Sequence, residues 1–430
     1  MFPLFRRGNK GEVMANIINI KELFTPNISN NLVSKTKGDR VIWGIVVILT
    51  LISLLVVYSS TGSLAYKYSK STESYLFKQF AFIVIGLLVI YFAHRVNYTI
   101  YARVAKVLFL ISIPLMFYTS FFGEEINKGS RWIKLPLINM TMQTSDLAKL
   151  ALFMYLSLQL SRKQNVIKDF KKGFLPIVIP VVIICALIAP ANLSTALLVG
   201  ATSFMLMFIG RVNTKHLLMS IGIALIPVVF LFTLAIGTYD KAAHKSKELP
   251  AILSGGRIPT WISRIQTFVY SNKEDENEKL YQINQAKIAI ANGSWLGRGP
   301  GNSEARNFLP HSYSDFIYAI IIEEYGLFGA AFMIFIYLLF LYRCIRLYRK
   351  CPYAFGAFLA LALSFTLVIQ AIANMGVAVN VFPNTGVTLP LVSMGGSSFL
   401  FTCLSIGIIL SVARNVEQLE GKNQPVVVNE

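Results

Sequence analysis

Apolar segments of about 20 residues recur along this chain, and they constrain its fold more than any other feature. A hydrocarbon core about 30 Å thick needs a helix of this length to cross it. Charged residues make up only 14% of the 430 residues, against about 25% in soluble domains. The sequence therefore predicts an all-α polytopic membrane protein with about ten spans, near 41–60, 79–93, 101–121, 145–160, 174–190, 193–210, 216–236, 315–342, 354–379 and 389–412.

The positions of Lys and Arg predict how these spans are oriented. Every second loop is basic, which is typical of cytoplasmic loops, so both termini are expected in the cytoplasm. The longest outer loop, 237–314, then joins spans seven and eight, and it contains an acidic run at 272–279. The chain accordingly divides into an N-terminal tail, a transmembrane domain and a C-terminal tail, at 1–40, 41–413 and 414–430.

A formal net charge of +19 would by itself suggest a nucleic-acid partner. The cations are instead spread through short loops, without a basic domain, and membrane topology explains most of them, so nucleic acid is excluded. The four cysteines form no CxxC pair, and neither a Walker sequence nor an HExxH motif occurs. The pattern therefore favours neither a disulfide framework, nor an ATP site, nor a metal site.

Three carboxylates stand in the apolar stretch "FLPHSYSDFIYAIIIEEYGLFGA" at 308–330. An acid inside a membrane costs about 2.5–3.5 kcal/mol on insertion scales, so each needs a reason. Asp315 is expected at the outer end of span eight, where it either accepts protons or caps the helix. Glu323 and Glu324 are expected deeper, on the same helix, as buried partners of a Lys or Arg.

Two further groups of polar residues border predicted spans at the outer side. Asp146 and Lys149 are three residues apart and can pair on one face of a helix. Ser397 and Ser398, after two glycines, open span ten, where they either offer donors to an anion or allow close helix packing. Other cations in the outer segments are Lys128, Arg131, Lys134, Arg257, Arg264, Lys287, Arg298 and Arg306. These cations either snorkel to the headgroups or together bind an anion such as a lipid-linked phosphate.

Several stretches together resemble the SEDS family of bacterial cell-wall synthesis, the FtsW/RodA/SpoVE proteins. They occur in family order over nearly the whole chain. They are "NKGSRWI" (127–133), "QTSDLAKLAL" (143–152), "PANLSTALLV" (190–199), "YQINQAKIAIANGSWLGRGPGNS" (281–303), "FLPHSYSDFIYAIIIEEYG" (308–326), "QAIANMGV" (370–377) and "LPLVSMGGSS" (389–398). The piece "GRGPGNS" is more similar to the division type than to the elongation type.

The resemblance implies a glycosyltransferase that polymerises lipid II on the outer face of the bacterial cytoplasmic membrane. It implies that Asp315, within "YSDF", is the general base, and it aligns Asp146 and Lys149 with an acid and a lysine of the family. Candidates to bind the pyrophosphate are Arg131, Lys149, Arg257, Arg264, Ser397 and Ser398, and a divalent cation could share that role. Asp146 stands where the family usually has Glu, and Asn192 stands where it usually has Asp.

The resemblance also implies partners, namely lipid II, a class B penicillin-binding transpeptidase, other division proteins and membrane lipid. Two other functions stay open. A lipid II flippase would use Glu323 and Glu324 as part of a path across the membrane. A non-catalytic scaffold would only recruit the transpeptidase.

Overall fold

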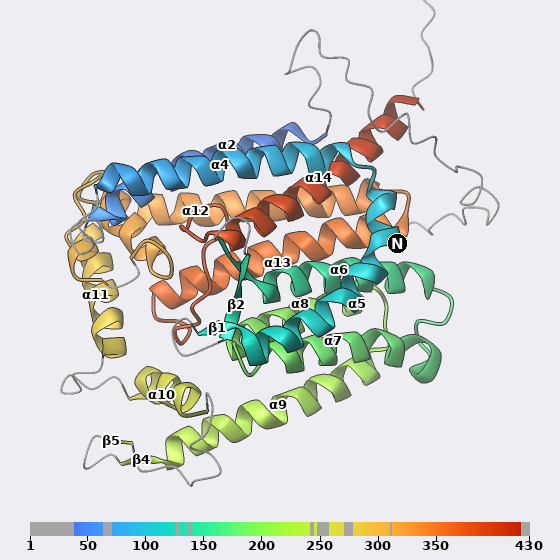
Figure 1. Cartoon of the computed structure of the whole chain (residues 1–430), viewed down its shortest axis with the longest axis horizontal. Helices are drawn as coiled ribbons and strands as arrows, with labels where there is room; N and C mark the ends of the chain where they lie inside the picture. The colour runs from blue at the N-terminus through green and yellow to red at the C-terminus, as the bar shows by residue number, and fades with distance from the viewer. Residues whose placement is uncertain are drawn as a thin grey trace, which may run out of the picture.

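The computed structural model describes residues 38–62, 71–125, 130–135, 140–240, 245–246, 258–270, 278–309 and 312–422. Long helices that run side by side dominate the fold (Figure 1). They are α2 (Arg40–Ser60), α4 (Thr72–Arg95), α5 (Tyr98–Phe122), α6 (Thr144–Arg162), α7 (Leu175–Ile188), α8 (Leu193–Ile209), α9 (Thr214–Gly237), α12 (Ile317–Lys350), α13 (Ala354–Ala378) and α14 (Ser397–Lys422).

In the described part of the chain, the remaining elements are two further helices, two turns and two small sheets. The helix α10 (Ile258–Val269) and the helix α11 (Glu278–Gly293) lie at one end of the bundle, on the left in Figure 1. A π-helical turn, η2 (Phe170–Phe174), precedes α7, and a 3-10 turn, η3 (Ala305–Asn307), follows α11. Two small antiparallel sheets consist of β1 (Glu124–Glu125), β2 (Ser130–Leu135) and β3 (Met140–Gln143), in that order, and of β4 (Tyr239–Asp240) and β5 (Lys245–Ser246).

The ten long helices coincide with the ten spans expected from the sequence. Eight are long and apolar enough to cross a membrane, namely α2, α4, α5, η2 with α7, α9, α12, α13 and α14. The helix α8 is apolar but has only 17 residues, and α6 is mostly buried and carries charged side chains near its start. The all-α polytopic fold is confirmed, whereas the count of ten spans and the cytoplasmic termini stay predictions.

Polar residues fix where several helices begin. Asp39, Ser71 and Asn97 each precede a helix, and their side-chain oxygens accept N–H groups from its first turn. These bonds satisfy donors that the helix itself leaves free. Asn192 caps α8 in the same way, which needs an acceptor oxygen but no charge. Asp39 also binds Arg343 at 2.6 Å and so connects the start of α2 with the far part of α12.

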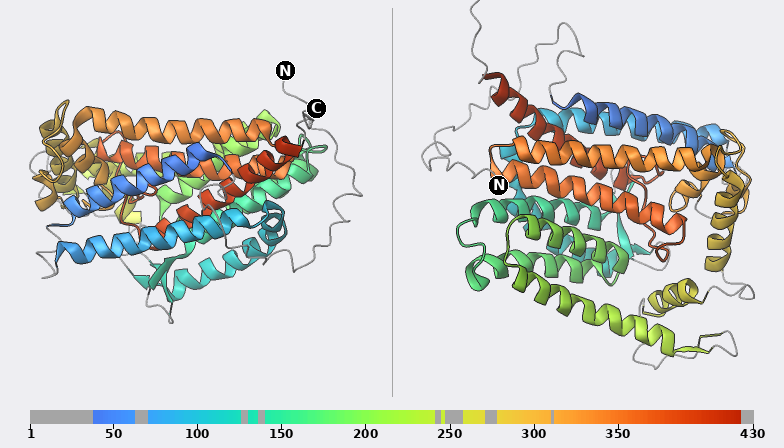
Figure 2. Two further views of the ribbon diagram at one scale, coloured as in Figure 1. Left: turned by 90° about the horizontal axis from the view of Figure 1, so that it is seen from above. Right: turned by 180° about the vertical axis from the view of Figure 1, so that it is seen from behind.

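The centre of the bundle is formed by α13 and α14. About three quarters of each of these two spans is buried, against 6% for α9. The helix α13 contacts α12, α14, α6 and α8, whereas α9 lies at the margin, next to α8 and α10 (Figure 2). Side chains that reach into the bundle from α13 therefore meet several neighbours at once, which suits this helix to hold a site in place.

The helix α12 differs most from the expectation. It begins at Ile317, so Asp315 lies in the turn before it and not on the same helix as Glu323. Gly326 interrupts it with φ 66° and ψ −166°. Across this break, Tyr318 Oη donates to the carbonyl of Ala330 at 3.2 Å, although a straight helix would separate these residues by about 18 Å. The segment 317–325 is thus folded back against the longer segment that follows.

A glycine-rich loop occupies the break in α12. Its N–H groups at Arg298 and Gly299 donate to the carbonyls of Glu323 and Glu324 at 2.9 and 3.0 Å. In return, the carbonyl of Ser294 accepts the N–H of Leu327 at 3.0 Å. The backbones approach so closely that a Cβ on Gly297 or Gly326 would overlap the opposing chain. The motif "GRGPGNS" therefore packs against the break and supplies its missing hydrogen bonds.

The expected tenth span begins later than predicted, because α14 starts at Ser397 and not at 389. The residues before it form an irregular loop, 384–396, that enters the bundle. Tyr337 Oη, from the middle of the long part of α12, donates to Pro390 O at 2.6 Å, and Ser53 Oγ, inside α2, donates to Val392 O at 2.8 Å. Such non-helical backbone is tolerated inside a membrane bundle because side chains of the protein form hydrogen bonds with its carbonyl groups.

Two predicted boundaries can be compared with the elements. The helix α14 continues without interruption to Lys422, beyond the predicted end of the transmembrane domain at 413. The predicted outer loop contains α10, α11 and η3, and most of its acidic run lies outside the described residues.

Candidate functional site

Asp315 lies in a turn, 312–316, that the entering loop 384–396 holds in place. Ser393 Oγ donates to Ser314 O at 2.7 Å, and the N–H of Met394 donates to Tyr313 O at 3.1 Å. Asp315 itself is half-buried. Ser312 Oγ, in the same turn, donates to Ser60 O, at the end of α2, at 3.1 Å. Asp315 therefore lies in the turn before α12 and not on the helix itself. Its position at the outer surface of the membrane stays a prediction.

Asn374, on α13, connects this turn to the loop. Its Nδ2 donates to Asp315 O at 3.1 Å and to Val387 O at 2.7 Å. The side chain is 1% exposed, and its Oδ1 accepts no hydrogen bond from the described residues. One turn earlier on the same helix, Gln370 Nε2 donates to Thr388 O at 3.0 Å. Two amide side chains of α13 thus hold both backbones that surround Asp315.

Gly386 lies beside the Asp315 carboxylate. Its φ of 63° is in the left-handed region, which favours glycine. A Cβ on this residue would stand 3.7 Å from Asp315 Oδ2. The backbone of the loop therefore comes next to the carboxylate without a side chain between them.

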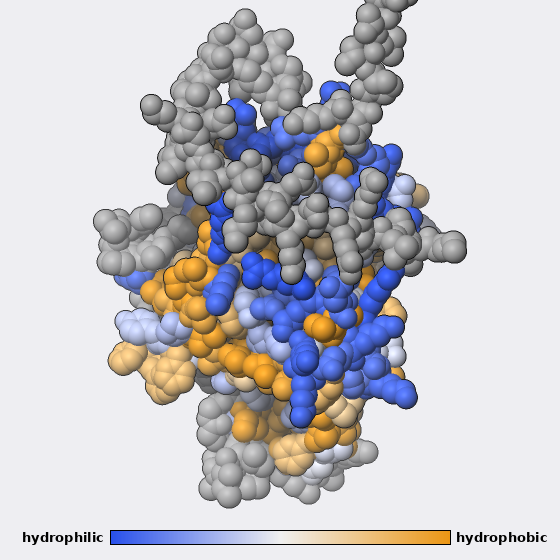
Figure 3. All heavy atoms as spheres, turned by 90° about the vertical axis from the view of Figure 1, so that its right-hand side faces the viewer, coloured by the Kyte–Doolittle hydropathy of each residue, from blue (hydrophilic) through white to orange (hydrophobic). Residues whose placement is uncertain are grey.

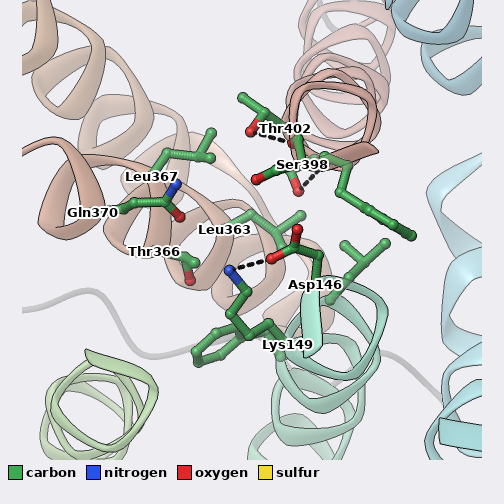
Figure 4. A pocket seen from close by; sticks show the side chains of 12 residues that line it. Asp146, Lys149, Leu363, Thr366, Leu367, Gln370, Ser398 and Thr402 are labelled. Carbon is green, nitrogen blue, oxygen red and sulfur yellow. Dashed lines mark hydrogen bonds and ion pairs between the residues drawn. The ribbon is translucent and has the colours of Figure 1, made fainter. Parts of the chain in front are cut away.

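Asp146 and Lys149 line a pocket between α6, α13 and α14 (Figure 4). Lys149 Nζ lies 2.7 Å from Asp146 Oδ1, so the predicted pair is confirmed. Both side chains are largely buried, and Asp146 Oδ2 has no hydrogen-bond partner among the described residues. Figure 4 shows Lys149 on the side of Thr366 and Gln370, and Asp146 below Ser398. The pocket thus contains a buried cation, and an acid holds that cation in place.

Ser397 and Ser398 occupy the first turn of α14, as predicted. Ser397 Oγ accepts the N–H of Gln143 at 3.2 Å, which joins α14 to the residue before α6. Ser398 lines the pocket that contains Lys149. Ser397 is therefore engaged in holding two elements together, whereas Ser398 borders the space that a ligand could occupy.

Glu323 is completely buried, and contrary to the expectation it pairs with no cation among the described residues. Its carboxylate accepts the Ser303 hydroxyl and the N–H groups of Glu304 and Ala305, the latter two at 3.2 Å. A negative charge at the N-terminal end of a helical turn is favourable because that end carries free N–H groups. Glu323 therefore fixes the loop after "GRGPGNS" to α12.

Glu324 has the expected basic neighbour, although a serine lies between them. Its carboxylate accepts a hydrogen bond from the hydroxyl of Ser59, at the end of α2, and it lies near enough to Arg306 for the two charges to attract each other. Arg306 Nη1 donates to Ser59 O at 3.2 Å. These three residues connect α2, η3 and α12, so both glutamates support the fold next to the site.

The other predicted cations are not brought to the pocket by the described contacts. Arg264 lies half-buried on α10, whose helix packs mainly against α9. Arg131 belongs to β2, and Arg257 lies outside the described residues. Loop 384–396 and α13 thus connect the turn of Asp315 with the pocket that contains Lys149, Asp146 and Ser398. Pyrophosphate binding by Arg131, Arg257 and Arg264 stays a prediction.

Gln370 and Asn374, which hold Asp315 and its loop, were not selected as site residues from the sequence, although the sequence contains a signal for both. Gln370 and Asn374 are uncharged amides four residues apart in an apolar run, and polar residues inside spans are functional candidates by default. Gly386 carries no such signal, because its role follows from the course of the loop. Among the described residues, no group of three or more His, Cys, Asp or Glu side chains could hold a metal ion.

These observations define a multi-pass helical bundle. Its candidate site combines an acid, Asp315, and a largely buried cation, Lys149, beside loop 384–396. Comparison with solved structures agrees on the fold. The chain superposes on one from the structure described as "Structural coordination of polymerization and crosslinking by a peptidoglycan synthase complex" with a TM-score of 0.65, 23% identity and coverage of 89% of this chain and 99% of that one. It matches the rod shape determining protein RodA of Thermus thermophilus with a TM-score of 0.59, at 23% identity, over 88% and 97% of the two chains.

Sequence comparison identifies the family. Residues 39–418 match the family described as "Cell cycle protein", which comprises FtsW, RodA and SpoVE. The chain is 29% identical to the "Probable peptidoglycan glycosyltransferase FtsW" of Trichlorobacter lovleyi over 90% of this chain and 96% of the relative. It is 30% identical to the protein of that name from Nitrosococcus halophilus over 88% and 93%. The chain therefore belongs to the FtsW/RodA/SpoVE family and is a multi-pass protein of the inner membrane.

Proposed function

We propose that this protein is a peptidoglycan glycosyltransferase that polymerises lipid II during cell division, with Asp315 as the general base. Membership of the family and the names of the relatives support the activity. The observation that best supports Asp315 as the base is the hydrogen bond from Ser393 to Ser314 O, which attaches the turn of Asp315 to loop 384–396. That loop leads directly into Ser398, which borders the pocket of Lys149. These connections support a single site to which the acid and the cation both belong.

The reaction requires both groups. The carboxylate of Asp315 takes the proton from the 4-hydroxyl of the acceptor sugar, and that oxygen attacks C1 of the donor sugar. The bond from C1 to the lipid pyrophosphate breaks, and the pyrophosphate leaves with the electron pair. Attack from the opposite face inverts the α-linked donor and gives a β-1,4 link. A positioned base of this kind contributes roughly 10²–10⁴-fold.

The leaving pyrophosphate needs a positive environment, for which Lys149 is the best-placed candidate. Its ammonium group is buried, and in such surroundings charge interactions are stronger than in water. Asp146 fixes the ammonium group through the 2.7 Å contact. In this proposal Asp146 positions Lys149, and Ser398 donates its hydroxyl to the same phosphate.

Partners are proposed on the same grounds. The structurally similar complex is described as coordinating polymerisation with crosslinking. We therefore expect this chain to act with a class B penicillin-binding transpeptidase and with other division proteins.

The flippase hypothesis assigns the central role to Glu323 and Glu324. Both carboxylates already accept hydrogen bonds from the loop after α11 and from α2. A lipid headgroup would have to break these bonds at each passage. This observation favours polymerisation over transport, and a scaffold function is compatible with either.

The test is polymerisation of purified lipid II by the purified full-length chain, alone and with its transpeptidase. Asp315→Asn should abolish the glycan product, because the amide cannot take the proton. Asp169→Asn is a matched control, since Asp169 caps η2 away from the site. Both variants should elute from gel filtration like the parent. Glycan strands of parental length made by Asp315→Asn would refute the assignment of the base.

Liposomes that contain lipid II separate the remaining functions. Movement of lipid II across the bilayer without any glycan product would favour the flippase. The absence of both, with the transpeptidase still bound, would favour the scaffold.

A further inference from the structure

Two arginines flank the contact that joins α14 to the end of α4, at the end of the bundle opposite to α11. Arg95 ends α4, and Arg414 lies in the part of α14 that continues toward Lys422. Ser411, three residues before Arg414, donates its hydroxyl to Val96 O at 2.5 Å. This bond fixes α14 against the turn between α4 and α5, so that Arg95 and Arg414 lie close enough for their charges to interact. Like charges repel, so holding them together needs a compensating group.

Close packing of the two helices leaves the pair little freedom to separate. The helix α4 packs along α14, and a Cβ on Gly407 would stand 2.6 Å from the Cβ of Ala93. Tyr101, on α5, donates to Ala93 O at 2.8 Å and closes the same corner. The positions of both arginines are therefore determined by the backbone and not by flexible loops.

The described residues do not supply an anion for Arg414. Its Nε is buried and has no hydrogen-bond acceptor among them. The acids at this end are engaged elsewhere, since Glu417 accepts the N–H of Gly38 at 2.6 Å and Asp39 binds Arg343. Glu420 pairs with Lys350 at 2.8 Å. A guanidinium group with a buried, unused donor is suited to a phosphate, which it can bind through two parallel hydrogen bonds.

Arg95 is arranged differently and faces outward. It is exposed, its Nη2 donates to Tyr91 Oη at 3.1 Å, and its guanidinium carbon lies 5.3 Å from the centre of the Tyr91 ring. This contact keeps the side chain beside the helix, where its remaining N–H groups stay available to a ligand. The pair thus combines a buried donor with an exposed one.

The surroundings indicate a ligand with apolar tails. Phe92 on α4 is 65% exposed, and Val107 on α5 is 54% exposed. Both belong to spans whose outward surface faces hydrocarbon in a membrane. Figure 3, which views this end of the bundle, shows hydrophilic residues gathered across it with apolar residues around them. A phosphate bound here would lie where polar and apolar surfaces meet.

We propose that Arg95 and Arg414 bind the phosphate of an anionic phospholipid, whose acyl chains lie along the exposed faces of α4 and α5. By the predicted topology this end is cytoplasmic, and anionic lipids of that leaflet bind basic pockets between helices. The site is separate from Asp315 and Lys149, and it does not depend on the proposed enzymatic function.

The experiment is native mass spectrometry of the purified full-length chain with added phosphatidylglycerol, compared with phosphatidylcholine. Arg414→Gln and Arg95→Gln should each weaken retention of phosphatidylglycerol about fivefold and leave phosphatidylcholine unchanged. Arg349→Gln is the matched control, because Arg349 is an exposed arginine near the end of α12, at the same end of the bundle. If Arg414→Gln does not fold, Arg95→Gln still tests the site, since Arg95 is exposed.

Two results would overturn the proposal. One is equal loss of phosphatidylglycerol in all three variants, which would indicate general surface attraction. The other is displacement of the lipid by millimolar inorganic phosphate in the parent chain, which would indicate a site for a free phosphate. Retention that resists phosphate and falls only in the two site variants supports a lipid site.

Discussion

Glu323→Ala should destabilise the protein strongly, because the carboxylate is the acceptor for a whole turn of loop. It accepts the Ser303 hydroxyl and the N–H groups of Glu304 and Ala305. Ser303 and Ala305 are 2% and 3% exposed, so water cannot replace the lost acceptor. Two buried donors left unpaired cost about 1–3 kcal/mol each, which gives about 2–6 kcal/mol in total. Glu323→Gln keeps one acceptor oxygen and should cost less.

The assay is unfolding of the purified protein in one detergent, followed by cysteine accessibility or intrinsic fluorescence. The matched control is Glu304→Ala, which removes an acid from the same turn. Its side chain is 71% exposed and pairs with Arg298 on the surface, so its loss should cost less than about 1 kcal/mol.

Polymerisation separates this structural role from a direct one. At a temperature where Glu323→Gln remains folded, the variant should retain polymerising activity. The reasoning would be refuted by a Glu323→Ala protein as stable as Glu304→Ala, or by a stable Glu323→Gln protein without activity. Either result would mean that the buried carboxylate serves a ligand and not the loop.

Three other predictions address the break, the holding of Asp315 and the pocket. Gly326→Ala should prevent stable folding, because the residue has φ 66° and its Cβ would overlap the Trp295 carbonyl; the yield of monodisperse protein measures this. Asn374→Ala should lower the rate of lipid II polymerisation at least about tenfold, while Asn374→Gln, which cannot bridge both carbonyls at the same spacing, should not restore it. Asp146→Asn should destabilise the chain by leaving a buried cation unpaired, and adding Lys149→Gln should restore thermal stability but not polymerisation. Full activity of the double variant would remove Lys149 from the mechanism.

The sequence predicted what depends on local composition. The apolar runs define all ten long helices, and the spacing of Asp146 and Lys149 predicts their ion pair, because both follow from helical periodicity alone. The caps at Asp39 and Asn97 can be predicted in the same way. The sequence pattern also correctly places Glu323 and Glu324 inside the protein, since a carboxylate is costly in lipid.

The tertiary structure decided the position and the neighbours of these same acids. A run in which Glu323 and Glu324 are the charged residues is predicted as one helix, and a single glycine does not show that the chain folds back at Gly326. That reversal depends on backbone hydrogen bonds with Ser294 and Gly299, which come well before it in the chain. It places Asp315 in a turn between Asn374 and Gly386, and it assigns Glu323 to loop N–H groups instead of a cation. Periodicity determines which face of a helix is polar, whereas contacts between distant segments determine what that face meets.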